Sequence, residues 1–304
     1  MITVKILDET APLEAVILGT AESLGGVPKL EETYDPKSRA HIEAGTYPKE
    51  KDLAEEMEQV AQVFKKYGVQ LYRPEIMEDY NQIFARDIAL VIGEKLVVPC
   101  VTPMRKRESD GIQYLIDQVA DVLLPDEHER MEGGDVMPWK GHLFVGYSKD
   151  EDFEKYEVAR TNEDGVEFLR KNFPDWELKA FELNKSDENP RENALHLDCC
   201  FQPVGKDKAV IYPGGFKNQD DAQFLIDFFG KENVFEITQE EMYEMFSNFF
   251  SISPEVVISD SSFVRLNEQL RKWGITVEEV KYREVAKMEG LLRCTTMPLR
   301  RKYD

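Results

Sequence analysis

Residues 132–147 have the sequence EGGDVMPWKGHLFVGY, in which a polar opening leads into two β-type runs. The first run extends to Met137, the chain turns near Lys140-Gly141, and the second run covers His142 to Tyr147. Two apolar runs around a glycine-containing turn are typical of a β-hairpin. The segment therefore predicts a hairpin whose opening carries two acidic residues.

Hairpins of the same plan recur along the chain. Clear copies cover residues 84–98 and 196–212, and fainter copies lie at residues 248–259 and from Gly290 onward. In each clear copy a polar or reactive residue opens a β-type run, and a turn leads into a second run.

Helical stretches, with apolar residues three or four positions apart, lie between the hairpins. We expect them at Glu50 to Lys66, Arg105 to Val119, Asp164 to Asn172, Asp220 to Phe229 and Ser262 to Trp273. Most are followed by a short β-type run, as at Val69 to Tyr72, Glu177 to Leu183 and Val234 to Ile237. The unit is strand, strand, helix, strand, and about five such units would close a ring in which neighbours bury one another's apolar faces. A non-repeating α+β domain would give similar local signals.

Composition narrows the class of protein. The chain has 304 residues, 42% of them hydrophobic, and no apolar run of membrane-spanning length. Its first residues lack the features of a signal peptide, so we expect a cytoplasmic protein. The formal net charge of −21 disfavours nucleic acids and anionic membranes as partners and would attract a small cationic substrate, although the same charge would also serve solubility alone.

The four cysteines form no CxxC pair, which indicates free thiols rather than a disulfide framework. Cys100 follows an apolar run and is expected to be a small core residue. Cys294 lies in EGLLRCTTMPL, residues 289–299, and is the candidate nucleophile.

Other candidate site residues stand at the hairpin openings. Strand alternation would place His196 and Asp198 on one face of their strand. Two glycines between Glu132 and Asp135 suggest a β-bulge or a close backbone approach, and Asp87 stands where polar sequence gives way to core. Taken singly, each has a structural explanation: a surface histidine, a tight turn with solvated acids, or an Arg-Asp pair.

If the ring prediction holds, these residues converge on one central pocket. Carboxylates around a cavity can hold a planar guanidinium by paired, charge-assisted hydrogen bonds. The guanidinium carbon is a poor electrophile, so attack on it needs a thiolate, and the leaving amine needs a proton. Cys294 and His196 would provide these two functions.

Four segments resemble the guanidino-group-modifying superfamily, which includes arginine deiminase, dimethylarginine dimethylaminohydrolase and glycine amidinotransferase. They are FARD at 84–87, EGGD at 132–135, HLD at 196–198 and RCTTMPL at 293–299, in the family's order. The resemblance implies an α/β fold, a pseudo-symmetric five-bladed propeller of ββαβ units that forms one catalytic domain over residues 1–304. It also implies Cys294 as nucleophile, His196 as general acid and base, and Asp87, Glu132 and Asp198 around the guanidinium, with Asp135 beside them.

Two arginines extend the resemblance. Arg160, in Arg160-Thr161-Asn162, is similar to the family arginine that holds a substrate α-carboxylate, and Arg105 or Arg107 would be its partner. This implies a free, arginine-like amino acid as substrate. Solvated surface arginines are the alternative interpretation.

The leading hypothesis is a cysteine hydrolase acting on arginine, citrulline or a close analogue through a covalent thioether at Cys294 that water resolves. The alternative is an amidinotransferase that passes the amidino group to an amine such as glycine. The segment from His196 to Cys294 is too short for the helical insertion typical of arginine deiminases. No cofactor or metal is expected, no nucleic acid or membrane partner is expected, and assembly into a homo-oligomer is compatible with the sequence.

Two other functional classes are compatible with parts of this pattern. A non-enzymatic binding module of the same fold would have no need of Cys294, His196 and the carboxylates in one pocket. A zinc enzyme could use Cys294, His196 and Asp198, but these residues lack the clustered spacing of metal ligands.

Overall fold

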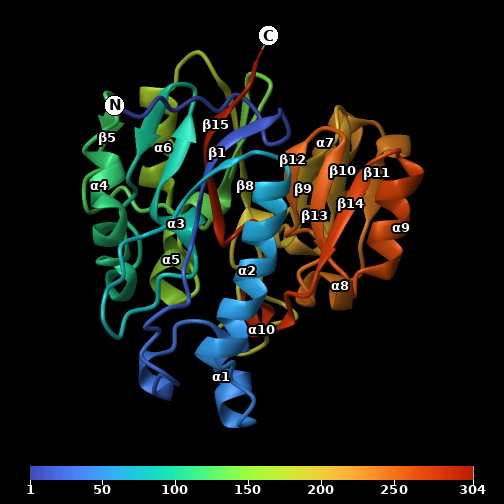
Figure 1. Cartoon of the computed structure of the whole chain (residues 1–304). Coiled ribbons are helices and arrows are strands. Elements are labelled where there is room, and N and C mark those ends of the chain that lie inside the picture. Colours follow the sequence, from blue (N-terminus) through green and yellow to red (C-terminus); the bar gives the residue numbers. More distant parts are fainter. Residues whose placement is uncertain (304) are drawn as a thin grey trace.

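Five mixed sheets of three strands each make up the β-structure of this chain. The computed structural model describes residues 1–303 and shows the chain passing through the sheets in turn, with the C-terminal strand returning beside the first one (Figure 1). The predicted mixed α/β fold of repeated units is confirmed.

Every sheet has the same internal order. Its central strand has one antiparallel and one parallel neighbour. The first sheet contains β15 (Thr296–Arg301), β1 (Leu13–Leu18) and β2 (Gln70–Tyr72), and the second contains β3 (Leu90–Ile92), β4 (Lys95–Val97) and β5 (Val122–Leu123). The third contains β6 (Val136–Trp139), β7 (His142–Tyr147) and β8 (Glu177–Glu182). The fourth contains β9 (Phe201–Val204), β10 (Lys208–Ile211) and β11 (Val234–Glu236), and the fifth contains β12 (Phe250–Ser253), β13 (Val256–Asp260) and β14 (Thr276–Val280).

Along the chain, the central strand of each sheet is connected to its parallel neighbour by a segment that contains a helix. These helices are α2 (Glu50–Lys66), α4 (Gln113–Ile116), α6 (Glu163–Asn172), α7 (Gln219–Phe229) and α9 (Val264–Lys272). The remaining helices are α1 (Pro36–Glu43), α3 (Ala85–Ile88), α5 (Asp150–Lys155), α8 (Gln239–Tyr243) and α10 (Arg283–Ala286).

Helix α2 shows how the apolar spacing builds the core. Leu53, Met57, Val60 and Phe64 recur three or four residues apart, and each is at most 1% exposed. Burying one such side chain contributes about 1.5–3 kcal/mol. Phe64 also meets Phe250 of β12 edge to face, with ring centroids 5.6 Å apart, so a helix of the first unit covers a strand of the fifth.

The segments that open the hairpins are turns, which corrects the prediction that they are strands. Asp87 lies in the short helix α3 (Ala85–Ile88), Glu132 precedes the 3-10 turn η4 (Gly133–Asp135), and His196 precedes η5 (Leu197–Cys199). Strand alternation therefore does not apply to His196 and Asp198. A turn leaves backbone N–H groups free, and here they donate to carboxylates: Gly134 to Asp87, and Leu197 to Asp135.

The helix predicted from Arg105 to Val119 is also wrong in extent. The segment is divided into the 3-10 turns η2 (Pro103–Arg105) and η3 (Glu108–Ile112) followed by α4. Gly111 is the physical reason, because a glycine disfavours a helix interior and its position here leaves no room for a side chain beside Gln82. Other 3-10 turns are η1 (Leu30–Glu32), η6 (Pro213–Gly215) and η7 (Lys231–Asn233).

Within residues 1–303, none of the helices has the length and apolar character needed to cross a bilayer. The cytoplasmic location, the oligomeric state and the lack of a nucleic acid partner stay predictions.

Candidate active site

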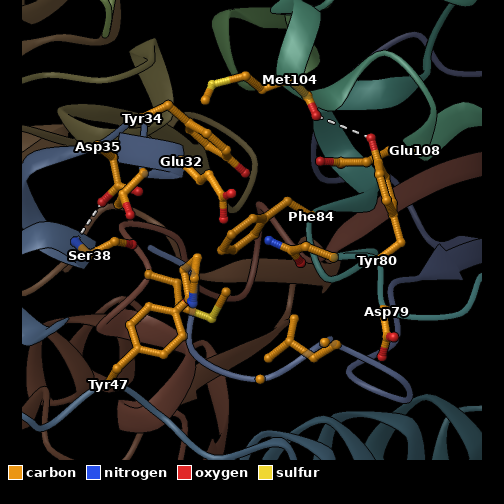
Figure 2. A pocket seen from close by; sticks show the side chains of 17 residues that line it. Glu32, Tyr34, Asp35, Ser38, Tyr47, Asp79, Tyr80, Phe84, Met104 and Glu108 are labelled. Atoms are coloured by element: carbon orange, nitrogen blue, oxygen red, sulfur yellow. Dashed lines mark hydrogen bonds between the residues drawn. The ribbon is translucent and has the colours of Figure 1, made fainter. Parts of the chain in front are cut away.

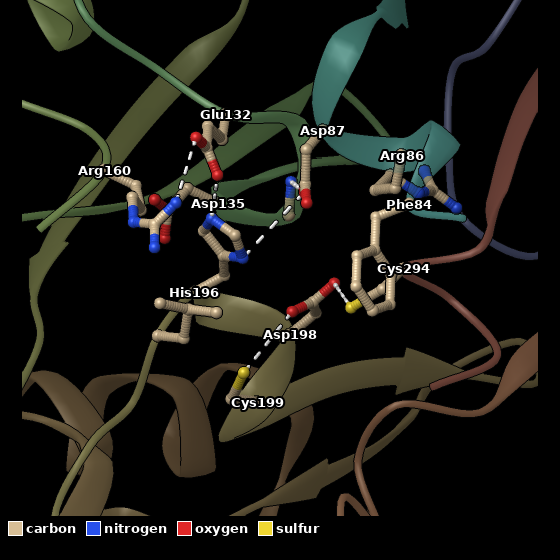
Figure 3. Close-up of polar contacts among 12 residues, drawn as sticks. Phe84, Arg86, Asp87, Glu132, Asp135, Arg160, His196, Asp198, Cys199 and Cys294 are labelled. Carbon is tan, nitrogen blue, oxygen red and sulfur yellow. Dashed lines mark hydrogen bonds and ion pairs between the residues drawn. The ribbon is translucent and has the colours of Figure 1, made fainter. Parts of the chain in front are cut away.

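The segments that precede the first strand of the hairpins meet at one place. Figure 3 shows the side chains of Asp87, Glu132, His196, Asp198 and Cys294 gathered there. Each residue lies just before the first strand of a hairpin, namely β3, β6, β9 (for both His196 and Asp198) and β15. The matching position before β12 is occupied by Asn248, whose amide contacts the sulfur of Cys294. The repeat therefore explains why residues far apart in the sequence share one site.

A small cavity of about 20 Å³ lies at this place. Five of the eight predicted site residues line it, namely Cys294, His196, Asp87, Arg105 and Arg160. The other three contact these residues from outside the cavity. Asp198 lies next to Cys294, Glu132 bonds His196, and Asp135 accepts from Thr161 and from the backbone of Leu197.

His196 is held by carboxylates. Its Nε2 lies 2.9 Å from Oε2 of Glu132, and its Nδ1 has no hydrogen-bond partner and lies 3.9 Å from Oδ1 of Asp87. Burial alone would lower the pKa of His196, but the negative charges of Asp87, Glu132 and Asp135 outweigh it and raise the pKa to about 9. At neutral pH the ring is therefore an imidazolium, which can donate a proton from Nδ1.

The two glycines of EGGD allow the backbone to approach this histidine. A Cβ built on Gly134 would lie 2.7 Å from Cγ and Nδ1 of His196, and one on Gly133 would lie 2.0 Å from the carbonyl oxygen of Arg86. Real Cβ atoms do not tolerate such distances, so only glycine fits at either position. The predicted close backbone approach is confirmed.

The Cys294 thiol is buried between an amide and a carboxylate. Asn248 Nδ2 lies 3.1 Å from the sulfur and donates to it, and Asp198 Oδ2 lies 3.7 Å away. Burial raises the pKa of Cys294 well above its usual range, and the charges of Asp198 and Asp87 raise it further. Both effects favour the protonated thiol at neutral pH.

Asn248 is a site residue that the sequence prediction missed. Its Oδ1 accepts from the backbone N–H groups of Arg293 and Cys294, while its Nδ2 reaches the sulfur, so it fixes both the loop and the nucleophile. The signal was its place in the repeat, since Asn248 opens the fourth hairpin just as His196 opens the third.

Replacing Asn248 with alanine is expected to raise the pKa of the Cys294 thiol, because a thiolate would lose its amide donor. A hydrogen bond to a charged group contributes about 1.5–3 kcal/mol, so thiolate formation should become about 10- to 100-fold less favourable. The pH dependence of alkylation at Cys294 measures this change. Asn172→Ala, on the outer helix α6, is the control, and an unaltered alkylation profile in Asn248→Ala would contradict the role.

The two predicted carboxylate-binding arginines differ in their surroundings. Arg105 is bonded twice to Glu108 at 2.8 Å, and its NH1 donates to Asp87 at 2.9 Å and to Glu132 at 3.1 Å. Arg160 donates to the carbonyl oxygen of Tyr34 at 2.9 Å and pairs with Glu132 at 3.5 Å, and its Nε has no hydrogen-bond partner although the residue is 1% exposed. Arg160 thus has a donor free for a ligand, whereas Arg105 is surrounded by carboxylates. Arg107 is exposed and lies outside the cavity.

Arg293 connects the segments that carry the candidate site residues. It donates to Asp198 at 2.9 Å and to both carboxylate oxygens of Glu9, and also to the carbonyl oxygens of Gly134 and Val136. Burial alone would raise the pKa of Glu9, but Arg293 and Arg86 lower it to about 2. One guanidinium thus joins segments at or just before β1, β6, β9 and β15.

Arg293→Met is expected to destabilise the protein by about 3–5 kcal/mol, because Glu9 and Asp198 would be left buried without their partner. The urea midpoint of unfolding measures the loss. Arg300→Met removes an ion pair of the same kind with Glu14, on a side chain that is 31% exposed, and should cost less than about 1 kcal/mol. Equal losses in the two variants would show that burial of the Arg293 network is energetically unimportant.

One group of side chains has the geometry for a cation. Ligand atoms of Asp87, Glu132 and His196 lie within 4.8 Å of one another. The Arg105 guanidinium already bonds both carboxylates, so a positive group of the protein itself occupies their shared side. The donor set is therefore satisfied by arginine, and we derive no role for a metal ion from it.

A larger cavity of about 220 Å³ adjoins the inner one and shares Tyr34, Asp35, Phe84 and Met288 with it. Figure 2 shows the side chains of Tyr47, Tyr80, Phe84 and Glu108 around this outer space. Its acidic lining favours a positively charged ligand.

Comparison with known proteins agrees with this geometry. Residues 38–301 match the family model described as N,N dimethylarginine dimethylhydrolase, eukaryotic. The chain belongs to this family. The predicted membership of the guanidino-group-modifying superfamily, whose members are enzymes, is thereby confirmed.

Two relatives of this dimethylarginine dimethylhydrolase family member are similar in sequence over most of its length. The uncharacterised protein YkgA of Bacillus subtilis is 29% identical over 220 residues, which cover 72% of this chain and 70% of YkgA. The arginine deiminase of Oenococcus oeni is 25% identical over 292 residues, covering 82% of this chain and 67% of the deiminase.

Two solved structures share the fold of this family member. SxtG, an amidinotransferase from Microseira wollei in the saxitoxin biosynthetic pathway, superposes with a TM-score of 0.76 at 17% identity and covers 99% of this chain and 98% of its own. The N-terminal domain of ArgZ, a cyanobacterial arginine dihydrolase, has a TM-score of 0.78 at 17% identity and covers 94% of this chain and 98% of its own.

Proposed function

We propose that this protein is a cysteine-dependent hydrolase of the guanidino or ureido group of an arginine-like free amino acid. The observation that carries the proposal is that the Cys294 thiol and the free Nδ1 side of His196 line one cavity, with Asp198 beside the sulfur and Asp87 beside the imidazole. We also propose that the five sheets close into a five-bladed propeller, with residues 1–304 as one catalytic domain.

The substrate guanidinium would lie between Asp87 and Asp198, where two carboxylates offer paired hydrogen bonds to a planar cation. Its positive charge would offset the two charges that keep the pKa of the thiol high. Binding of the substrate therefore favours the thiolate in the same step that places the electrophilic carbon beside the sulfur. The proton of the thiol leaves to solvent or to a neighbouring base.

Attack by the sulfur forms a C–S bond and a tetrahedral carbon. The C–N bond to the leaving amine then breaks as His196 donates its proton to the nitrogen, leaving a thioether intermediate on Cys294. The neutral imidazole next takes a proton from water, whose oxygen attacks the same carbon, and the C–S bond breaks to release the ureido product. Glu132 holds the ring through Nε2 during both proton transfers.

Arg105 has to yield some of its contacts when a substrate enters. Its NH1 bonds both Asp87 and Glu132, and the inner cavity has room only for a group about the size of a water molecule. A substrate guanidinium would replace the contact of Arg105 with Asp87.

Product analysis tests the proposal. The protein is incubated with L-arginine, N,N-dimethylarginine or citrulline, each with and without glycine, and citrulline, ornithine and guanidinoacetate are measured. We expect product without an acceptor, and a transient mass adduct on the peptide that contains Cys294. Product formed only with glycine would establish the amidinotransferase alternative, and no turnover or adduct with any of the compounds would overturn the proposal.

A further inference from the structure

Lys185 is a buried lysine that the proposed mechanism does not use. It is 8% exposed and lies between β8 and η5, in the segment that leads to His196. A lysine is almost never this buried in a folded protein unless its charge is paired. Lys185 is not among the residues that line the inner cavity, so contact with a substrate there does not explain its position.

The ammonium group of Lys185 binds the backbone directly before His196. Its Nζ donates to the carbonyl oxygens of Ala194 and Leu195, each at 2.8 Å. These are the last two carbonyl groups before the histidine, whose own backbone is extended, with φ −136° and ψ 170°. Lys185 therefore fixes the chain on the N-terminal side of His196.

Asp135 binds the backbone directly after His196. Its Oδ1 accepts from the N–H of Leu197 at 2.9 Å, and its Oδ2 accepts from the hydroxyl of Thr161 at 2.6 Å. Gly146 of β7 lets this carboxylate lie against the sheet, because a Cβ at that position would be 2.4 Å from Oδ1. A cation before His196 and an anion after it thus hold the same short stretch of chain.

The two groups are also matched in charge. Asp135 is fully buried, and burial raises its pKa, while the positive charges of His196 and Lys185 oppose that rise. Burial lowers the pKa of Lys185, and the charge of Asp135 opposes that change. A neutral amide could bind the same carbonyl oxygens at a smaller desolvation cost, so the attraction to Asp135 gives a reason for a charged side chain here.

The Asp135 carboxylate also reaches the second partner of the imidazole. The Thr161 hydroxyl that donates to Asp135 accepts from the backbone N–H of Glu132 at 3.3 Å. Glu132 in turn lies 2.9 Å from Nε2 of His196. The backbone of His196 and the carboxylate that orients its ring are therefore both connected to one buried pair of charges.

We propose that Lys185 is a positioning residue for the reaction, which acts with Asp135 to fix the backbone of His196 and hence the direction of the Nδ1 proton. The inference rests on the proposed function, because His196 is its general acid. Proton transfer needs a donor within hydrogen-bond reach of the leaving nitrogen, and a displacement of about 1 Å can cost about 100-fold in rate. Lys185 meets this need without touching the substrate.

Two substrates separate a role in positioning the proton from a general loss of structure. L-Arginine loses an amine, which must be protonated as it leaves, whereas S-methyl-L-thiocitrulline loses methanethiol, a much better leaving group. We expect Lys185→Met to lower kcat/KM for L-arginine by about 10- to 100-fold, with KM within about twofold of the wild-type value. The kcat/KM for S-methyl-L-thiocitrulline should fall by less than about threefold, because its leaving group depends little on a general acid.

Two further variants make the result specific to the charge and position of Lys185. Lys185→Arg keeps a cation with several N–H donors and should recover most of the lost rate. The surface cavity of about 260 Å³ that Lys185 lines gives room for the larger group. Lys179→Met removes a lysine of β8 whose side chain is 43% exposed, and it should leave kcat/KM unchanged for both substrates.

The histidine ring can also be observed without turnover. The side-chain NMR signals of His196, assigned by their loss in His196→Ala, should shift in Lys185→Met and stay in place in Lys179→Met. Unshifted signals, an unchanged rate with L-arginine, equal losses with the two substrates, or a rate in Lys185→Arg as low as in Lys185→Met would each overturn the positioning role. Failure of the wild-type protein to turn over any guanidino or ureido compound would overturn the proposed function instead, and the NMR comparison would still test the link between Lys185 and His196.

Discussion

Cys294→Ala is expected to abolish turnover by at least about 10⁴-fold, since no other group can form the covalent intermediate. The fold should be retained, because the change removes one sulfur atom from a site where Asn248 still bonds the backbone N–H groups of Arg293 and Cys294. Product assays measure the loss, and mass spectrometry of the peptide spanning residues 289–299 should show no adduct.

The matched control for this variant is Cys100→Ala. Cys100 lies between β4 and β5 and is partly exposed, which corrects its prediction as a core residue; its thiol donates to the carbonyl oxygen of Glu127 at 3.6 Å, away from the inner cavity. Its replacement should leave turnover unchanged. Appreciable product from Cys294→Ala, or an adduct carried by Cys199, Cys200 or Cys100 in the wild-type protein, would remove Cys294 from the mechanism.

His196→Ala is expected to slow turnover by about 10²- to 10⁴-fold, the range that general acid–base catalysis contributes. The pKa of about 9 sets the direction of the pH dependence. Below it the ring carries the proton that the leaving amine needs, so kcat/KM of the wild-type protein should fall as the pH rises through about 9. This alkaline limb should be absent from His196→Ala, and a pH profile identical to that of the wild type would contradict the role.

The same residue predicts a change in stability. The pKa of His196 is higher in the folded protein than its ordinary value of 6.5. The charged ring therefore stabilises the folded protein, and this contribution is complete at a pH below 6.5. This contribution is lost as the pH rises through about 9. The control is His142→Ala, because His142 is partly exposed and pairs with Glu177 on the surface. This variant should change neither the pH dependence of kcat/KM nor the pH dependence of the stability.

The order of strands and helices could be predicted from sequence because it depends on local apolar spacing. The limits of α2 were predicted as they are observed, since Leu53, Met57, Val60 and Phe64 mark a single buried stripe. The turn conformation of the hairpin openings could not be predicted, because it is stabilised by hydrogen bonds from backbone N–H groups to carboxylates that are distant in the sequence. Asp87, for example, accepts a hydrogen bond from the backbone N–H of Gly134, and the two residues are too far apart in the sequence for a local pattern to indicate the contact.

The candidate site was predictable only where its residues have unusual chemistry. A cysteine, a histidine and a double glycine stand out in a sequence, whereas Asn248 and Asp35 are common residue types in polar segments. Glu289 lies within the Cys294 segment, but its burial beside Asp35 joins residues that are more than 250 positions apart in the sequence. Contacts of this kind follow from tertiary packing and leave no periodic signal.

The pairing of β15 with β1 places the candidate nucleophile two residues before a strand whose partner lies more than 270 positions earlier in the chain. Residues 13–18 have no antiparallel neighbour until residues 296–301 have left the ribosome, and closing so long a loop is a slow, non-local event. Assembly of the thiol site is thus coupled to this long-range pairing. A nascent or truncated chain without its final strand would hold the carboxylates and the imidazole without the reactive sulfur in place, and so would bind cations before it could modify them.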